Sequence, residues 1–215
     1  MQLTAAALWL NSAFAGFDES ITLAVHKLYE ATNGAISPVM EFISLLGKGG
    51  IFLIILSLCL MFLKRNRRFG TAMILGLAIG AIFVNLFLKV VIARPRPYAD
   101  ENSIYYSLWV LMGQHIESDM SFPSGHTNAA FAAMVPLFIL GDKKVSWLAL
   151  VFGILMGISR IYLVVHFPSD VLGGLITGTI AGMLGTLIAI NFPQKWYGWP
   201  VEKRGNHEKC SDSES

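Results

Sequence analysis

The sequence predicts an all-α protein, a polytopic transmembrane helix bundle with five to six spans and an N-terminal amphipathic helix. Only 14% of the 215 residues are charged, whereas soluble domains carry about a quarter. Hydrophobic residues make up 54% of the chain, and the mean hydropathy is +0.59. Several apolar runs approach the ~20 residues that an α-helix needs to cross a bilayer. The length suits a single domain, and the net charge of +2 is too small to indicate nucleic acid as a partner.

The N-terminal segment 1–35 is predicted to be an interfacial helix or a first transmembrane helix. Residues 1–16 are apolar but short for a span, and residues 17–33 are amphipathic. The first 17 residues contain no Lys or Arg, so the positively charged start of a secretory signal peptide is missing.

The segment 36–192 is predicted to be the membrane domain. Its expected spans are 40–63, 70–92, 124–141, 145–164 and 170–191. The first span is continuously apolar only from about residue 50 and contains the flexible sequence Gly47-Lys48-Gly49-Gly50. We therefore expect a bend or break in this helix near residues 47–50.

The basic residues of the short loops predict the orientation. Loop 64–68 holds four of them, loop 141–144 holds two, and more follow in the polar tail 193–215. Five spans place all three segments on one side, which the positive-inside rule assigns to the cytoplasm. The tail is then cytoplasmic, and the opposite ends of the spans face outward.

Three polar clusters lie at these outer ends. They are the segments 89–97 (KVVIARPRP), 123–126 (PSGH) and 159–170 (SRIYLVVHFPSD). Their basic residues need anionic partners, because charge near membrane depth is costly and usually functional. Loop 98–122 offers four candidates for simple ion pairing, namely Asp100, Glu101, Glu117 and Asp119.

Together the clusters have the chemistry of a phosphate site. Arg binds phosphate oxygens in bidentate fashion, and Lys adds a point charge. Ser124 and Gly125 precede an apolar helix, whose N-terminal N–H groups favour anions. A histidine can attack phosphorus while a second protonates the leaving oxygen. Asp170, four residues after His166, can hold that histidine's other nitrogen.

The three clusters resemble the signature motifs of the type-2 phosphatidic acid phosphatase superfamily, in its membrane-bound bacterial branch. These motifs are K-x6-R-P, P-S-G-H and S-R-x5-H-x3-D, and all match without substitution between residues 89 and 170. The resemblance implies an integral protein of a bacterial plasma membrane with an outward-facing site. Residues 1–60 contribute little to this resemblance.

The resemblance also implies roles for single residues. His166 is expected to be the nucleophile, Asp170 to orient it, and His126 to be the general acid. The phosphoryl oxygens are expected to be bound by Lys89, Arg96, Ser124, Gly125 and Arg160. No metal and no other cofactor is expected, because the cations neutralise the developing charge.

The function predicted on this basis is hydrolysis of a lipid phosphate or diphosphate monoester through a phosphohistidine. Undecaprenyl diphosphate, phosphatidylglycerophosphate and phosphatidic acid are the substrates considered. A lipid-linked phosphotransferase and a non-catalytic lipid-phosphate binding or transport protein are alternatives. An intramembrane serine protease that uses Ser124 leaves the three cations and Asp170 unexplained.

Some residues have plainer interpretations. Ser124 alone suits a helix N-cap, and His166 with Asp170 alone suits a structural pair at a helix start. Arg94 lies outside the motif spacing and is expected to serve structure or lipid headgroups. Gly174, Gly178 and Gly182 form a stripe that allows close helix packing. We expect that stripe to face a helix of the same chain, with a homodimer contact as the alternative.

Overall fold

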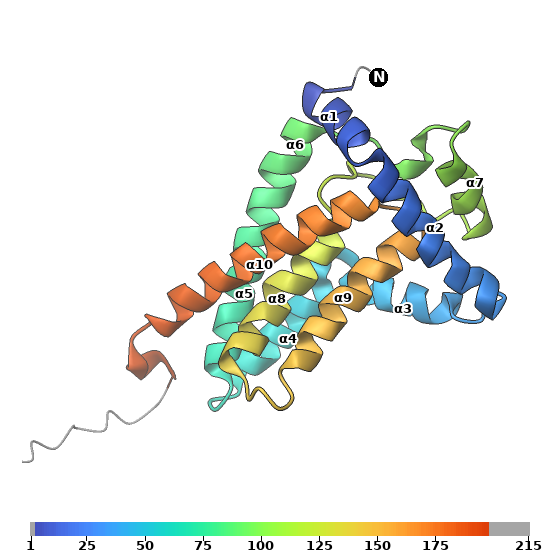
Figure 1. Ribbon diagram of the computed structural model, residues 1–215. Coiled ribbons are helices and arrows are strands. Elements are labelled where there is room, and N and C mark those ends of the chain that lie inside the picture. The colour runs from blue at the N-terminus through green and yellow to red at the C-terminus, as the bar shows by residue number, and fades with distance from the viewer. Residues whose placement is uncertain (1–2, 198–215) are drawn as a thin grey trace, which may run out of the picture.

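The computed structural model describes residues 3–197, and every regular element in this range is helical (Figure 1). The α-helices are α1 (Ala5–Ala13), α2 (Ala15–Thr32), α3 (Ser37–Gly47), α4 (Ile51–Phe62), α5 (Arg67–Ala81), α6 (Lys89–Ile92), α7 (Ile104–Leu111), α8 (Gly125–Leu140), α9 (Trp147–Tyr162) and α10 (Pro168–Ile190). Short helical turns are η1 (Lys48–Gly50), η3 (Pro97–Ala99) and η4 (Gln194–Tyr197), and η2 (Ile82–Leu88) is a π-helix. The predicted all-α fold is confirmed. The predicted tail lies outside the described residues from position 198 on.

Three helical stretches are long and apolar enough to cross a membrane. They are Ser37–Phe62, Arg67–Ala99 and Pro168–Ile190. Helices α8 and α9 are apolar but have only 16 residues each, somewhat fewer than the ~20 of a typical span. These five stretches coincide with the five spans expected from the sequence.

The break between α3 and α4 is formed by glycines, as predicted. Helix α3 ends at Gly47 and α4 begins at Ile51. Between them Gly49 and Gly50 have φ angles of +61° and +67°, which glycine adopts without the steric penalty of a Cβ. A Cβ on Gly47 would lie 2.7 Å from the ring of His126. The break therefore brings the end of α3 against the first turn of α8.

The glycine stripe of α10 packs within the chain. A Cβ on Gly174 would lie 2.6 Å from the backbone oxygen of Ser124, and one on Gly178 would collide with Asn128. Gly182 packs against α8 in the same way, and α10 also lies along α5 (Figure 1). The homodimer contact considered for this face is therefore wrong, because α8 already covers the three glycines. The expectation of a partner helix in the same chain is confirmed.

Helices α1 and α2 run across the ends of α9 and α10 rather than alongside them (Figure 1). Ala7, Leu10, Asp18 and Thr22 are their buried residues. A buried Asp on an otherwise amphipathic helix needs a partner, and it finds one beside the site described next. Whether this segment lies at the membrane interface stays a prediction.

Candidate active site

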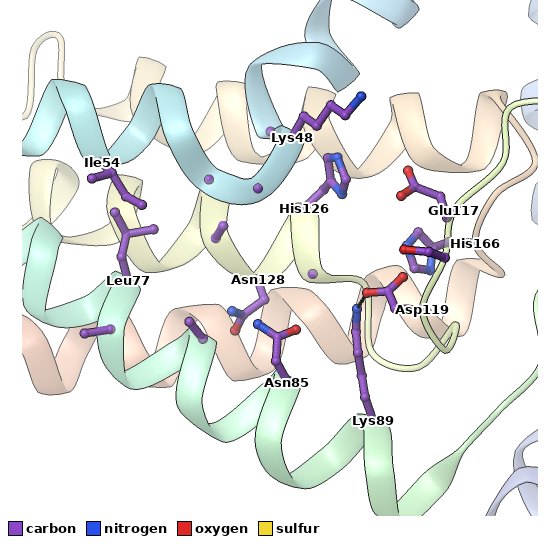
Figure 2. A pocket seen from close by; sticks show the side chains of 18 of the residues that line it. Lys48, Ile54, Leu77, Asn85, Lys89, Glu117, Asp119, His126, Asn128 and His166 are labelled. Atoms are coloured by element: carbon purple, nitrogen blue, oxygen red, sulfur yellow. Dashed lines mark hydrogen bonds and ion pairs between the residues drawn. The ribbon is translucent and has the colours of Figure 1, made fainter.

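A cavity of about 420 Å³ opens between α4, α5, η2, α8 and the loop before α8 (Figure 2). Polar groups line one end, where Lys89, Arg96, His126 and His166 come together. The other end is apolar and is formed by residues of α4 and α5, namely Ile54, Ile74, Leu77, Ala78 and Ala81. Residues from three sequence motifs that are far apart in the chain thus line one cavity, and the cavity continues into an apolar part.

His166 lies at the base of the polar end, in the short loop between α9 and α10. Its side chain is buried, and Nε2 lies 2.9 Å from Nη1 of Arg96. Burial, together with Arg96, Arg160 and Lys89, holds the pKa of His166 well below its usual value. The imidazole is therefore neutral near pH 7, and Nε2 is the nitrogen that faces the cations.

Asp170 lies behind His166, in the first turn of α10. Its Oδ2 is 3.6 Å from Nδ1 of His166 and accepts a hydrogen bond from the backbone N–H of Phe167 at 2.9 Å. Ser121 donates to the same oxygen and lies 3.5 Å from Nδ1. His166 and Asp170 thus lie close together, as the sequence predicted, and the Ser121 hydroxyl bridges the two.

The three cations of the motifs are paired with carboxylates of the loop before α8. Asp119 contacts both Lys89 and Arg96 through its two oxygens, and Glu117 contacts Arg160. Burial acts to raise the pKa of Asp119, but Lys89 and Arg96 outweigh it and lower that pKa. The ion pairing considered from the sequence is realised, with an ionised carboxylate at the point where two cations converge.

The P-S-G-H motif contributes unequally to the cavity. Gly125 lines it, and a Cβ there would lie 3.4 Å from Nζ of Lys89. His126 projects into it from the first turn of α8 (Figure 2). Ser124, by contrast, is fully buried as the N-cap of α8, and its Oγ accepts hydrogen bonds from Thr127 at 3.0 and 3.4 Å. The N-cap interpretation thus describes Ser124 in this conformation.

Several polar residues of the site carried no signal in the sequence. Asn85, on the π-helix η2, and Asn128 both line the cavity and face each other in Figure 2. Oδ1 of Asn128 is buried without a hydrogen-bond partner. Ser121 and Asp18 are two further polar residues of the site that the sequence did not indicate. None of the four stands in a motif, and a single polar residue in an apolar helix does not reveal which neighbour it will meet.

Arg94 has the structural role that the sequence left open. It is buried at 1% exposure, and its guanidinium contacts Asp170, Ser169 and Asp18. Its carbon Cζ also lies 4.0 Å from the centre of the Phe167 ring. Among residues 3–197, no group of three or more His, Cys, Asp or Glu side chains is arranged to hold a metal ion.

Comparison with known proteins identifies the family of this chain. Residues 68–194 match the PAP2 superfamily. The undecaprenyl-diphosphatase BcrC of Bacillus subtilis is 31% identical over 162 residues, which cover 75% of this chain and 78% of that protein. An undecaprenyl-diphosphatase of Sulfolobus acidocaldarius is 29% identical over 157 residues, covering 73% and 72%.

A solved structure has a similar fold. The transmembrane PAP2-type phosphatidylglycerolphosphate phosphatase of Bacillus subtilis superimposes with a TM-score of 0.67 at 28% identity. The match covers 88% of this chain and 92% of that one. The chain belongs to the PAP2 superfamily and is a membrane phosphatase. The family expected from the three motifs is confirmed.

Proposed function

We propose that this protein hydrolyses a lipid phosphate or diphosphate monoester at the outward-facing membrane surface through a phosphohistidine. The observation that carries the proposal is the position of His166. Its neutral Nε2 lies beside Arg96 in a cavity that also holds Lys89 and His126. A nucleophile, a second histidine and converging cations are the parts that phosphoryl transfer requires.

The first chemical step follows from this arrangement. The terminal phosphoryl group takes the place of the Asp119 carboxylate between Lys89 and Arg96, with Arg160 and the Gly125 amide on its other oxygens. Nε2 of His166 attacks phosphorus, and the bond from phosphorus to the leaving oxygen breaks. His126 gives that oxygen a proton. Asp170 stabilises the positive charge that develops on the His166 ring.

The second step returns the enzyme to its first state. A water molecule gives a proton to His126 and attacks phosphorus, and the bond from phosphorus to Nε2 breaks. Inorganic phosphate leaves, and the carboxylate of Asp119 returns to the cations. The cations neutralise the developing charge in both steps, so neither reaction step uses a metal ion.

The apolar end of the cavity supports a lipid as substrate. The wall between α4 and α5 continues directly from the cations, so a chain attached to the bound phosphate would lie against Ile54 and Leu77 (Figure 2). The relatives named above act on undecaprenyl diphosphate or phosphatidylglycerophosphate. These two are the leading substrate candidates, and phosphatidic acid is the third.

The distribution of charge supports an outward-facing site. The loops between α4 and α5 and between α8 and α9 lie at the end of the bundle opposite the site (Figure 1). Lys64, Arg65 and Arg68 line a groove at that end. The positive-inside rule assigns this end to the cytoplasm of a bacterial plasma membrane and the active site to the outside. A reporter fused after residue 215 that proves extracytoplasmic would contradict this orientation.

The test is phosphate release by purified protein in detergent, with EDTA present, across the three lipids. We expect release that EDTA spares, and loss of that release in His166→Ala. The folded state of the variant is checked by its thermal transition. Full activity of His166→Ala would contradict the assigned nucleophile. Labelled His166 with little free phosphate until an alcohol acceptor is added would favour the phosphotransferase instead.

A further inference from the structure

Arg94 and Asp18 form a second charged unit behind the proposed nucleophile, outside the three motifs. We propose that Arg94, anchored by Asp18 of α2, is a positioning residue that fixes Asp170 and thereby His166. The proposal rests on the proposed function, because it assigns these two residues to the support of a catalytic histidine. It also makes the N-terminal helices part of the active site.

Every nitrogen of the Arg94 guanidinium has a partner. Nη1 donates to Oδ1 of Asp170 and to Oγ of Ser169, both at 2.7 Å. Nη2 donates to Oδ2 of Asp18 at 2.9 Å, and Nε donates to Oδ1 of Asn11 at 2.8 Å. A planar guanidinium with fixed partners on all sides cannot rotate without breaking several hydrogen bonds. Arg94 is thus held in one orientation by groups from α1, α2 and α10.

The two oxygens of Asp170 have separate tasks. Oδ2 faces His166, Ser121 and the Phe167 amide, whereas Oδ1 is bound by Arg94. The carboxylate torsion of an Asp is broad when nothing restrains it. Contacts on both oxygens therefore set the plane of the carboxylate and the direction in which Oδ2 meets the imidazole.

Asp18 ties this unit to the start of α10. Its Oδ1 accepts the backbone N–H of Ser169 at 2.7 Å, and its Oδ2 accepts the Ser169 hydroxyl at 2.8 Å as well as Arg94. A carboxylate is favourable at a helix N-terminus, where backbone N–H groups lack helical partners. Asp18 thus holds both Arg94 and the helical turn that carries Asp170. It lies outside residues 68–194, the part that matches the superfamily.

The experiment compares Arg94→Lys and Asp18→Asn with a control, Arg67→Met. Within the part of the chain that the structure describes, Arg67 donates to the backbone oxygens of Met61 and Trp196, at the far end of the bundle. For each variant we would measure kcat, KM and the inhibition constants of vanadate and of inorganic phosphate. Vanadate adopts the five-coordinate geometry of phosphoryl transfer and bonds to the nucleophile, whereas phosphate only occupies the cation site.

Arg94→Lys keeps the charge but can no longer hold Asp170, Ser169 and Asp18 together. We expect its kcat to fall about 10²-fold, the usual consequence of misplacing a reacting group by an ångström. Asp18→Asn keeps one acceptor oxygen, for the backbone N–H of Ser169, and loses the acceptor for Arg94 and the Ser169 hydroxyl. We expect kcat to fall about tenfold, as for loss of a supporting hydrogen bond. The vanadate constant should rise by the same factors, while KM and the phosphate constant stay at their wild-type values. Arg67→Met should leave all four unchanged.

Three outcomes would overturn the proposal. The first is wild-type kcat and vanadate inhibition in both folded variants. The second is a parallel rise of KM and of the phosphate constant, which would place Arg94 at the anion site. The third is an equal loss in Arg67→Met, which would indicate general destabilisation. If Arg94→Lys fails to fold, Asp18→Asn decides between these outcomes. If wild-type protein releases no phosphate from any lipid, the proposed function fails, while vanadate titration still tests the positioning of His166.

Discussion

Two sets of ion pairs lie on opposite sides of His166, and they differ in their access to water. Behind the histidine, Arg94 is paired with Asp18 and Asp170, and all three side chains are at most 2% exposed. In front of it, Lys89 and Arg96 are buried, but their partner Asp119 is 48% exposed. Glu117, the partner of Arg160, is 29% exposed.

The difference indicates which pairs are fixed and which can be exchanged. Removing one partner from a buried pair leaves an uncompensated charge, at a cost of about 3–5 kcal/mol. A pair whose carboxylate is partly exposed is screened by water and salt, so its worth lies nearer the roughly 0–1 kcal/mol of a surface pair. The rear set is therefore a permanent part of the structure. The front set presents buried cations with a carboxylate that a phosphate dianion can replace.

The largest effect is expected from breaking the rear set at Asp170. Asp170→Asn keeps the shape of the side chain and an acceptor for the Phe167 amide, but it removes the charge behind His166. Loss of the carboxylate that orients a catalytic histidine costs about 10⁴-fold in kcat in serine proteases, and we expect a loss of that order here. Phosphate release at saturating lipid measures it. An activity within tenfold of wild type in a folded protein would contradict the role of Asp170.

The next effect is expected from the front set at Arg96. Arg96 contacts Asp119, the backbone oxygen of Val165 and Nε2 of His166. Lys cannot make these contacts together, because its three N–H donors all lie on one nitrogen. We expect Arg96→Lys to lower kcat/KM by about 10²-fold, as for the loss of one donor to a developing charge. A similar loss that is confined to KM would mean that Arg96 binds the ground state and the transition state equally.

The stability of the protein should depend on pH through His166. Its pKa is lowered in the folded state, so below about pH 6.5 the unfolded chain binds a proton that the folded chain does not. The contribution of neutral His166 to the free energy of unfolding is thus fully present above pH 6.5. It falls as the pH drops, by at most ~1.4 kcal/mol per pH unit for one group. Asp119 remains ionised in this window, because its pKa is lowered as well. Thermal transitions between pH 7.5 and 5 should show the fall, and His166→Gln should reduce it. An equal slope in both proteins would contradict the assignment to His166.

The parts of the molecule that follow from local patterns were predictable. Apolar runs predicted the spans, and three glycines within four residues predicted the break near 47–50. The motifs predicted that Lys89, Arg96, His126 and His166 would meet, because each lies at the same end of the predicted bundle. Local composition and spacing contain this information directly.

The remaining features depend on contacts between distant segments. Asp18 and Ser169 are 151 positions apart, and nothing in either neighbourhood indicates that they pair. Four acidic residues of loop 98–122 were candidates for the cations, and only the turn of the loop selects Glu117 and Asp119. That turn has Gly113 and Gln114 at positive φ, and Tyr98 holds Glu117 through its backbone. Ser124 shows the same limit, because an N-cap and a phosphate ligand look alike in sequence.

The smallest effect sharpens the comparison, because it removes an exchangeable partner without touching a cation. Asp119→Asn should strengthen inhibition by inorganic phosphate up to about fivefold, which corresponds to an exposed pair worth up to ~1 kcal/mol. The lipid KM should fall in parallel and kcat should stay constant, since the carboxylate competes for the cations and takes no part in the chemistry. The gain should shrink at high salt, where the competing pair is already screened.

The matched control is Asp100→Asn, the same change in the same loop. The Asp100 side chain accepts a hydrogen bond from the backbone N–H of Asn102, within its own turn. Among residues 3–197 it forms no ion pair with any of the three cations. It should leave phosphate inhibition unchanged. Weaker inhibition in Asp119→Asn would reverse the interpretation of the front set, because the carboxylate would then be needed to hold Lys89 and Arg96 in place. The front pairs would in that case be as permanent as the rear ones, and substrate would have to bind beside Asp119 rather than in its place.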